Sequence, residues 1–419
     1  MCLLALLVAC GEQAGDQTSG AAVVDVWAHA GQASERLVLE RQTARFNRSQ
    51  TDIRVQLTFI PERSYNSQVQ AAAVADDLPD VLEFDGPFLF NYVWQGHLTP
   101  LDELLGAATQ SGLLPSISSQ GSYHGRYYGV GTFDSGLGLF ARRSALATAG
   151  VRIPSGPEDA WTDDEFAAAL KLLASNDSDG KVLDLKLNYS GEWFTYAFSP
   201  ILQSAGGDLI DRNGYQSAAD VLNGPYSVAA MTALQRWFNS GFVDPNVDDA
   251  AFTGRRVALS WAGHWEYPRY AEVLGDDLLL LPLPDFGQGS RTGQGSWVWG
   301  ITKHSQSQRA AARFLEFLLK TDEVLAMASA NGAVPATHAA IERSPLYGAA
   351  GPLRLFTQQL QDGFAVPRPQ TPVYPVVSSA FQRAFVDIRN GGDVKSALDK
   401  AVSTIDQDIR DNKGYPQID

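Results

Sequence analysis

The sequence predicts an α/β fold in which helices cover a largely parallel sheet. Between residues 23 and 84, short apolar segments alternate with segments of helical periodicity, in the order strand, helix, strand, helix, strand. This order is typical of parallel sheets with crossover helices. The 419 residues are 45% hydrophobic and 19% charged, which is the composition of a globular protein large enough to bury its core without disulfides.

The first elements follow from the hydrophobic pattern. Strands are expected at residues 23–27, 53–59 and 80–84, where short apolar or alternating runs occur. Helices are expected at residues 34–46 and 65–75, because apolar residues such as Leu39 and Phe46 recur there at helical spacing. These five segments would form one parallel sheet with its first two covering helices.

The middle of the chain is richer in helix. Thr162 and Glu165 form a capping box just before the apolar positions of a helix that contains Phe166 and Leu170. Further helices are expected at residues 194–203 and 225–238, and short strands at 257–260, 278–281 and 297–302. From residue 305 the pattern is helical almost to the end, with breaks at prolines.

The N-terminal segment carries a processing signal. Residues 1–9 are almost wholly apolar and end in Leu-Val-Ala before Cys10 and Gly11. Small residues ahead of a cysteine resemble the bacterial lipobox, so residues 1–10 are expected to be a lipoprotein signal segment with lipidation at Cys10. The alternatives are a secretory apolar region that contains a chance cysteine and a fragment of a buried element. Residues 11–22 (GEQAGDQTSGAA) are expected to form a flexible tether, which would place the protein outside the cytoplasm, in the periplasm or at the cell surface, anchored to the membrane by its lipid.

Composition and motifs argue against several function classes. The net charge is −15 and Lys/Arg clusters are lacking, which argues against a nucleic-acid partner. The sequence has no phosphate-binding loop, no nucleophile elbow and no pair of histidines at zinc-binding spacing. Residues 176–180 (NDSDG) resemble part of a calcium loop, but Lys186 stands where the bidentate glutamate is required, so a solvated turn is expected. No cofactor and no metal are therefore expected.

Aromatic residues at strand–loop junctions predict a ligand cleft. The chain has nine tryptophans. Trp193 opens a helix, Trp265 lies just after an expected strand and Trp297 just before one. Ligands bind at strand ends in open α/β sheets, and flat aromatic faces suit the apolar faces of pyranose rings. The alternative is that each of these tryptophans belongs to the core.

Five segments, in this order and spacing, resemble the extracellular solute-binding proteins of carbohydrate ABC transporters, of the maltose/trehalose type. They are residues 78–85 (LPDVLEFD), 95–102 (QGHLTPLD), 133–140 (FDSGLGLF), 295–303 (GSWVWGITK) and 366–375 (VPRPQTPVYP). The resemblance extends from about residue 23 to the C-terminal helices. It implies a two-lobe periplasmic-binding-protein-like fold (type II), with the ligand in a cleft between lobes joined by crossing strands.

The resemblance also implies lobe boundaries. Lobe 1 would contain residues 23–132 and 285–335, and lobe 2 residues 133–284 and 336–419. The crossings are expected at residues 131–138 and 281–289. The site residues that it implies, together with Trp193 from the aromatic pattern, are Glu35, Arg63, Tyr65, Asp85, Asp134, Trp193, Trp265, Tyr267, Trp297 and Arg368.

The chemistry of two of these residues supports the assignment independently. Asp85 follows an apolar strand and Arg368 lies in a proline-rich segment; sugar hydroxyls donate to carboxylates and accept from guanidinium groups. The alternatives are a helix cap for Asp85 and a structural salt bridge for Arg368.

The expected function is capture of a sugar or oligosaccharide by a monomeric, non-enzymatic protein, which delivers the ligand to ABC transporter permease subunits. Two alternatives remain open. One is a binding protein for another solute, such as a glycerophosphate, a polyol or an amino sugar. The other is a secreted carbohydrate-active enzyme, because two carboxylates at the right distance suffice for a glycosidase.

Overall fold

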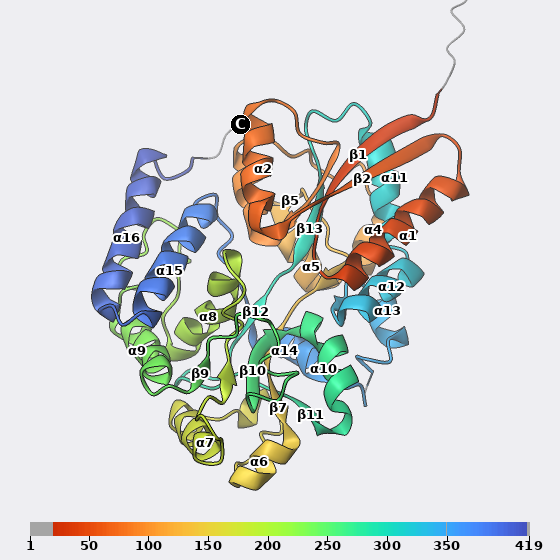
Figure 1. Ribbon diagram of the computed structural model, residues 1–419. Coiled ribbons are helices and arrows are strands. Elements are labelled where there is room, and N and C mark those ends of the chain that lie inside the picture. Colours follow the sequence, from red (N-terminus) through yellow and green to blue (C-terminus); the bar gives the residue numbers. More distant parts are fainter. Residues whose placement is uncertain (1–19, 349, 417–419) are drawn as a thin grey trace, which may run out of the picture.

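The computed structural model of the protein describes residues 20–348 and 350–416. Figure 1 shows two α/β halves, one above the other, with extended segments running between them. Each half is built on its own sheet, one of four strands and one of five. The predicted α/β fold is confirmed.

The first sheet has the strand order β13-β3-β1-β2. It contains β1 (Ala22–His29), β2 (Ile53–Ile60), β3 (Val81–Asp85) and β13 (Trp297–Ile301). Strand β1 pairs in parallel with β2 and β3, and β13 runs antiparallel to β3. The carboxyl ends of the three parallel strands therefore meet the start of β13 at one edge of the sheet.

Helices α1 (Ala33–Ser49) and α2 (Glu62–Val74) connect the first three strands, as predicted. Helix α1 packs against α12 (Thr321–Asn331), and α11 (Gln308–Leu318) packs against β1 and β13. The C-terminal part of the chain thus helps to cover the first sheet. Amphipathic spacing explains these contacts, because Leu39 and Phe46 of α1 are both buried in the shared core.

The second sheet has the order β11-β7-β10-β8-β9. Its strands are β7 (Leu137–Arg142), β8 (Leu183–Asp184), β9 (Val243–Asp244), β10 (Leu259–Gly263) and β11 (Leu278–Leu281). A second core joins this sheet to α7 (Asp163–Ser175), α8 (Glu192–Ala205), α9 (Pro225–Asn239), α15 (Tyr374–Arg389) and α16 (Val394–Asp411). The predicted capping box is confirmed, because Thr162 and Glu165 each bond the other's backbone N–H at the start of α7.

The remaining elements are short. The helices are α3 (Leu89–Trp94), α4 (Ala107–Gly112), α5 (Pro115–Gln120), α6 (Arg143–Ala149), α10 (Tyr267–Leu274), α13 (His338–Arg343) and α14 (Arg354–Gln361), and single 3-10 turns span Gly86–Phe88, Pro157–Asp159, His264–Glu266 and Gly275–Asp277. The strands are β4 (Ser122–Tyr123), β5 (Arg126–Tyr127), β6 (Phe133–Asp134), β12 (Thr292–Gln294), β14 (Val334–Pro335) and β15 (Ala365–Pro367).

Two segments connect the halves in the middle of the chain. Val130 bridges to Trp299 of the first sheet and Leu137 begins β7 of the second, so residues 131–136 cross between the halves. Residues 281–289 do not cross. The backbone N–H groups of Asp285 and Gln288 donate to carbonyls of Trp161 and Ser204, which hold this segment on the second half. The chain crosses later, between β12 and β13.

The expected lobe boundaries shift accordingly at two places. Residues 285–294 lie with the second half, because β12 packs against α8. Helix α13 was expected in lobe 2, which was to begin at residue 336. It packs against α12 and β14, and α12 packs against α1, so α13 lies with the first half. The sequence pattern marks the elements but does not show which half a short connecting strand joins.

Candidate functional site

The edge of the first sheet collects several of the predicted residues. Trp297 is paired with Asp85 across β13 and β3, and His29 ends the neighbouring strand β1. Glu35 lies in the first turn of α1, which follows β1 directly. Because the parallel strands end together here, the sheet itself brings these side chains to one place.

Trp297 is a half-buried ring that is supported from two sides. Its indole stacks on the imidazole of His29, with centroids 3.7 Å apart and planes 5° from parallel. The ring of Tyr65 meets it edge-on at 5.6 Å. Tyr65 is only 1% exposed and its hydroxyl donates to the backbone carbonyl of Trp27. Tyr65 therefore supports Trp297 from within the core and does not offer its own surface to a ligand.

Glu35 is tied into the start of α1. One carboxylate oxygen accepts from the backbone N–H of Gln32 at 2.6 Å, which completes a capping box. The other accepts from the side-chain amide of Asn331 at 2.9 Å.

Arg63 lies in α2, and its side chain is outside the described part of the structure.

Asp85 and Arg368 form a bidentate ion pair. Two guanidinium nitrogens of Arg368 donate to the two carboxylate oxygens of Asp85 at 2.9 and 2.6 Å. Arg368 also donates to Glu192 at 2.8 Å. The salt-bridge alternative for Arg368 is thus what the structure shows, and the helix-cap alternative for Asp85 is wrong because its side chain makes no capping bond.

Glu192, which begins α8 of the second half, was missed by the sequence analysis. It accepts from Arg368 and from the hydroxyl groups of Tyr374 and Ser378. Burial raises the pKa of this carboxyl, and the Arg368 cation opposes the shift. Burial alone would lower the pKa of Arg368, but Asp85, Tyr374 and Glu192 raise it well above its ordinary value. The position just before Trp193 was the available signal.

The second half contributes a group of aromatic rings. Trp193 meets Trp265 edge-on at 5.9 Å and Tyr189 at 5.3 Å. Trp193 is 7% exposed and its indole N–H donates to the carbonyl of Leu185. It therefore belongs largely to the core, which was the alternative to a place in the ligand cleft. Trp265 is half-buried and is the more accessible ring of the pair. Tyr196 lies under the Arg368 guanidinium at 4.8 Å.

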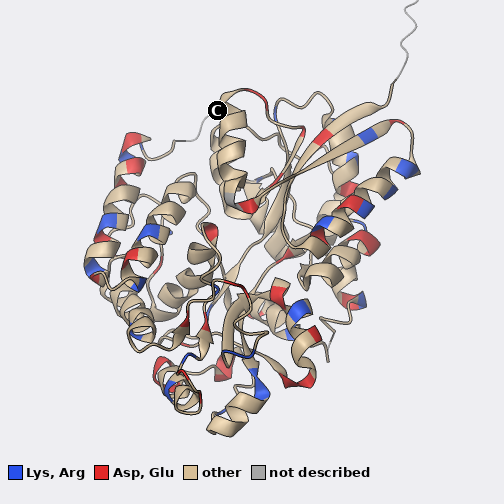
Figure 2. Ribbon diagram, in the orientation of Figure 1, with Lys and Arg blue, Asp and Glu red and all other residues tan. Residues whose placement is uncertain are grey.

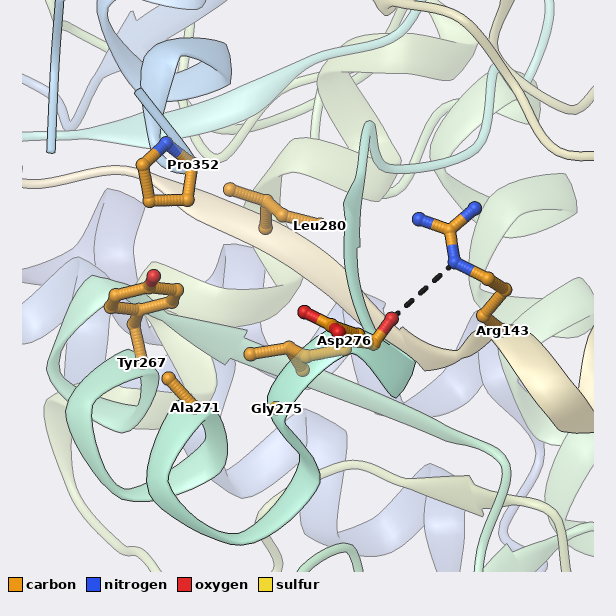
Figure 3. Close-up of a pocket in the computed structure, with 8 residues that line it drawn as sticks. Arg143, Tyr267, Ala271, Gly275, Asp276, Leu280 and Pro352 are labelled. Atoms are coloured by element: carbon orange, nitrogen blue, oxygen red, sulfur yellow. Dashed lines mark hydrogen bonds between the residues drawn. The ribbon is translucent and has the colours of Figure 1, made fainter. Parts of the chain in front are cut away.

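Tyr267 does not join these residues. It lines a separate hollow of about 490 Å³ beside β11, together with Arg143, Leu280 and Pro352. Figure 3 shows its ring facing Pro352 and Leu280, while Arg143 donates to the carbonyl of Asp276 farther along the hollow. Trp265 and Tyr267, which were both expected at the site, lie apart because helix α10 begins at Tyr267.

Asp134 is fully buried in the first crossing. One carboxylate oxygen accepts from the backbone N–H groups of Ser135 and Gly295 and from the amide of Gln120. Burial raises the pKa of this carboxyl. Asp134 therefore joins the first crossing to Gly295, in the segment between β12 and β13.

A buried ion network lies behind the aromatic rings of the second half. The ammonium of Lys186, 0% exposed, pairs with Asp249 and lies 3.3 Å from Glu266. Glu266 also binds Arg269 and the hydroxyl of Tyr189. Lys186 thus has its charge inside the protein, where the ammonium also lies 5.1 Å from the centre of the Tyr189 ring.

The predicted solvated turn at residues 176–180 is confirmed, because Asp177 accepts hydrogen bonds from the backbone N–H groups of Asp179 and Gly180.

Figure 2 shows basic and acidic residues mixed along α1 and α16. Among the helices of residues 20–348 and 350–416, none is both long and apolar enough to cross a membrane.

Two α/β halves joined by crossing segments, with aromatic and charged groups gathered where they meet, define a two-lobed binding protein. The model of the bacterial extracellular solute-binding protein family matches residues 28–324, and the chain belongs to this family, which consists of binding proteins and not of enzymes. A Streptomyces antibioticus protein described as an uncharacterized lipoprotein in the oleD 5'region is 24% identical over 361 residues, which cover 83% of this chain and 77% of that protein.

Solved structures show the same fold. The cyclic alpha-maltosyl-1,6-maltose binding protein of Arthrobacter globiformis has a TM-score of 0.75 at 24% identity, covering 94% of this chain and 100% of that one. The GacH receptor of Streptomyces glaucescens GLA.O has a TM-score of 0.78 at 19% identity, covering 93% and 98%. The predicted two-lobe periplasmic-binding-protein fold is thereby confirmed.

Proposed function

We propose that the protein captures a neutral sugar or oligosaccharide outside the cytoplasm and delivers it to the permease subunits of an ABC importer. The observation that carries this proposal is the half-buried Trp297, stacked on His29 and paired with Asp85 at the sheet edge. An indole beside hydrogen-bonding carboxylates suits a ring that is apolar on its faces and hydroxylated on its rim. The names of the structural relatives, which include binding proteins for maltose-type saccharides, support it.

The charges of the site favour a neutral ligand over a phosphate. Arg368 and His29 already bind carboxylates, namely Asp85, Glu192 and Glu83. Glu35 accepts its hydrogen bonds from neutral groups. Among the described side chains of the site, the carboxylates therefore outnumber the cations, and the cations Arg368 and His29 are already paired. A glycerophosphate would have to displace one of these pairs, whereas sugar hydroxyls can donate to the carboxylates directly.

Binding would be coupled to closure of the two halves. A ligand that contacts both Trp297 of the first half and Trp265 of the second stabilises the closed arrangement over an open one. The short crossings at residues 131–136 and 295–296 would act as the hinge. The protein would bind its ligand as a monomer.

A lipid anchor is the second part of the proposal. Cys10 lies outside the described residues, and the support comes from the sequence pattern and from the lipoprotein of Streptomyces antibioticus. Strand β1 begins at Ala22, the last residue of the expected tether. A lipid at Cys10 would keep the protein at the membrane surface near the permease.

A thermal-shift screen tests the ligand class. The panel contains neutral linear and cyclic gluco-oligosaccharides, mannobiose, an amino-bearing pseudo-oligosaccharide, polyols and glycerol 3-phosphate. A true ligand at 100 times its Kd stabilises the folded state by about 2.7 kcal/mol. We expect a shift with at least one neutral sugar and none with glycerol 3-phosphate. A shift with the phosphate alone would replace the proposal by its rival.

A further inference from the structure

Strand β2 forms an open edge of the first sheet, on its side away from β1. It lies last in the order β13-β3-β1-β2 and pairs with β1 along its whole length. The other outer strand, β13, is bridged on its far side by Val130. Within residues 20–348 and 350–416, no strand pairs with the open edge of β2. Such an edge is a template on which another chain can add a strand.

The backbone groups of β2 point alternately to β1 and to the open edge. The carbonyl of Ile60 accepts from the backbone N–H of Ala30, just after β1, so the even-numbered residues of β2 face β1. The odd-numbered residues therefore have their N–H and C=O groups on the open edge. These residues are Ile53, Val55, Leu57 and Phe59.

Two side-chain amides at the C-terminal end of α1, which packs against β2 (Figure 1), occupy half of this edge. The amide of Gln50 donates to the carbonyl of Ile53 at 2.8 Å and accepts from its N–H at 2.7 Å. The amide of Asn47 donates to the carbonyl of Val55 at 2.9 Å and accepts from its N–H at 2.8 Å. Each amide thus makes the two hydrogen bonds that a residue of a neighbouring strand would make.

The sequence of β2 favours pairing with copies of itself. Residues 55–60 (VQLTFI) contain no charge, no proline and no glycine. Short uncharged segments rich in such strand-forming residues stack on identical segments of other chains. The edge-facing backbone groups of Leu57 and Phe59 have no hydrogen-bond partner in the part of the chain that the structure describes. Only these two residues of the edge are therefore left open.

We propose that the edge of β2 fits β2 of a second copy of this chain, and that Asn47 and Gln50 keep the protein monomeric by occupying that edge. The two amides take the place of a neighbouring strand at Ile53 and Val55. An incoming strand finds only the backbone groups beyond them, a stretch shorter than the strand pairings that are stable in proteins. This inference does not depend on which ligand the protein binds.

The double variant Asn47→Ala/Gln50→Ala tests the proposal by sedimentation and by hydrogen exchange resolved to single residues. The full chain is used, and every sample carries Cys10→Ala so that no lipid holds copies together. Without further changes, we expect the mass of one chain, protected amides at Ile53 and Val55, and fast exchange at Leu57 and Phe59. In the double variant, the sedimenting mass should shift with concentration to that of a dimer or larger species. The amides of Leu57 and Phe59 should then exchange slowly, because a second β2 binds them.

Two further variants separate pairing at the edge from a general loss of stability. Thr162→Ala removes the capping bond of α7 in the second half and leaves β2 intact, so it should remain monomeric. Gln56→Lys, added to the double variant, should restore the monomer. Gln56 is exposed in the middle of β2, so two paired copies would bring its like charges together.

The outcomes decide the proposal. A double variant that remains monomeric at every concentration overturns it. Association that leaves Leu57 and Phe59 in fast exchange, or that Thr162→Ala shows equally, would locate the contact elsewhere and overturn it too. If the double variant does not fold, Asn47→Ala and Gln50→Ala are measured singly, since each uncovers one residue of the edge. Fast exchange at Ile53 and Val55 before these changes would show that the two amides do not cover the edge.

Discussion

The guanidinium of Arg368 bridges the two halves of the protein through Asp85. Asp85 ends β3 of the first half, and the same cation donates to Glu192 at the start of α8 in the second. Arg368 is 5% exposed, so its charge is compensated almost entirely by these two carboxylates. Arg368 therefore forms ion pairs with both acids, whereas Asp85 and Glu192 each form an ion pair with this one cation.

The first prediction follows from this asymmetry. Arg368→Ala leaves Asp85 and Glu192 without a cation, and breaking a buried ion pair in this way costs about 3–5 kcal/mol. Asp85→Ala leaves Arg368 bound to Glu192, so we expect a smaller loss of stability but a roughly ten- to hundredfold loss of sugar affinity. Urea unfolding and calorimetry measure the two effects.

Arg343→Ala is a suitable control, because its pair with Asp322 is exposed and worth at most about 1 kcal/mol. Equal losses of stability in Arg368→Ala and Asp85→Ala would show that Arg368 does not neutralise two acids at once.

Much of the fold could be predicted because it depends on local pattern. The alternation in β1 to β3, the capping box at Thr162 and the strand at Trp297 are visible in single segments. The second crossing could not, because residues 285–289 are held on the second half by backbone bonds to Trp161 and Ser204, far away in sequence.

Less of the candidate site could be predicted, because it is assembled from residues that are far apart in the sequence. Asp85 and Trp297 could be singled out because each lies at the end of an expected strand, and the structure pairs them across β3 and β13. Glu192 and His29 became visible only when tertiary contacts brought Arg368 and Trp297 to them. Tyr267 was expected from the family resemblance, but its ring lies in a different hollow, where α10 begins.

The second prediction concerns acid. His264 is 2% exposed, its Nδ1 lies 2.8 Å from the carbonyl of Asn331 and its Nε2 lies 2.9 Å from the hydroxyl of Ser135. Burial lowers its pKa from 6.5 to about 4. The unfolded chain therefore takes up the proton first, and the contribution of His264 to stability is present above pH 6.5 and lost as the pH falls toward 4. Urea unfolding at a series of pH values should show a weaker acid dependence in His264→Gln than in the wild type; parallel curves would contradict this.

The third prediction concerns base. The pKa of His29 is raised to about 9 by Glu83 and its neighbours, against the lowering effect of burial. Its contribution to stability is fully present below pH 6.5 and is lost as the pH rises to about 9, because over this range the unfolded chain has released a proton that the folded state still holds. Unfolding measured from pH 6.5 to 10 should show this loss in the wild type. The variant His29→Phe/Glu83→Gln should show a flatter curve, and an unchanged slope would remove His29 as the cause.

The fourth prediction concerns the anchor. Cys10→Ala should leave the thermal unfolding of the protein unchanged and release it from membranes into the soluble fraction, because the expected lipid is attached outside the folded part. Cell fractionation of the full chain expressed in a bacterium measures this. Ser34→Ala, at an exposed position of α1, is a control that should stay with the membrane. Quantitative membrane association of Cys10→Ala would refute the lipoprotein proposal.

The last prediction distinguishes a binding protein that closes from one that does not. Trp265 lies in the second half and Trp297 in the first. A ligand held between them would remove indole surface from water, so the emission spectrum should change in a saturable way with one ligand per protein. The change should be smaller in Trp265→Phe and in Trp297→Phe, and the same in Trp94→Phe, whose indole N–H binds the carbonyl of Pro416 outside the site.

X-ray scattering of the same samples should show a smaller radius of gyration with ligand than without it. The sugar should be recovered intact after hours of incubation, because tight binding of the ground state alone does not accelerate its cleavage. A fluorescence change without compaction would retain the binding site and discard hinge closure. Compaction together with an unchanged spectrum in the wild type would instead retain the hinge and place the ligand away from Trp265 and Trp297.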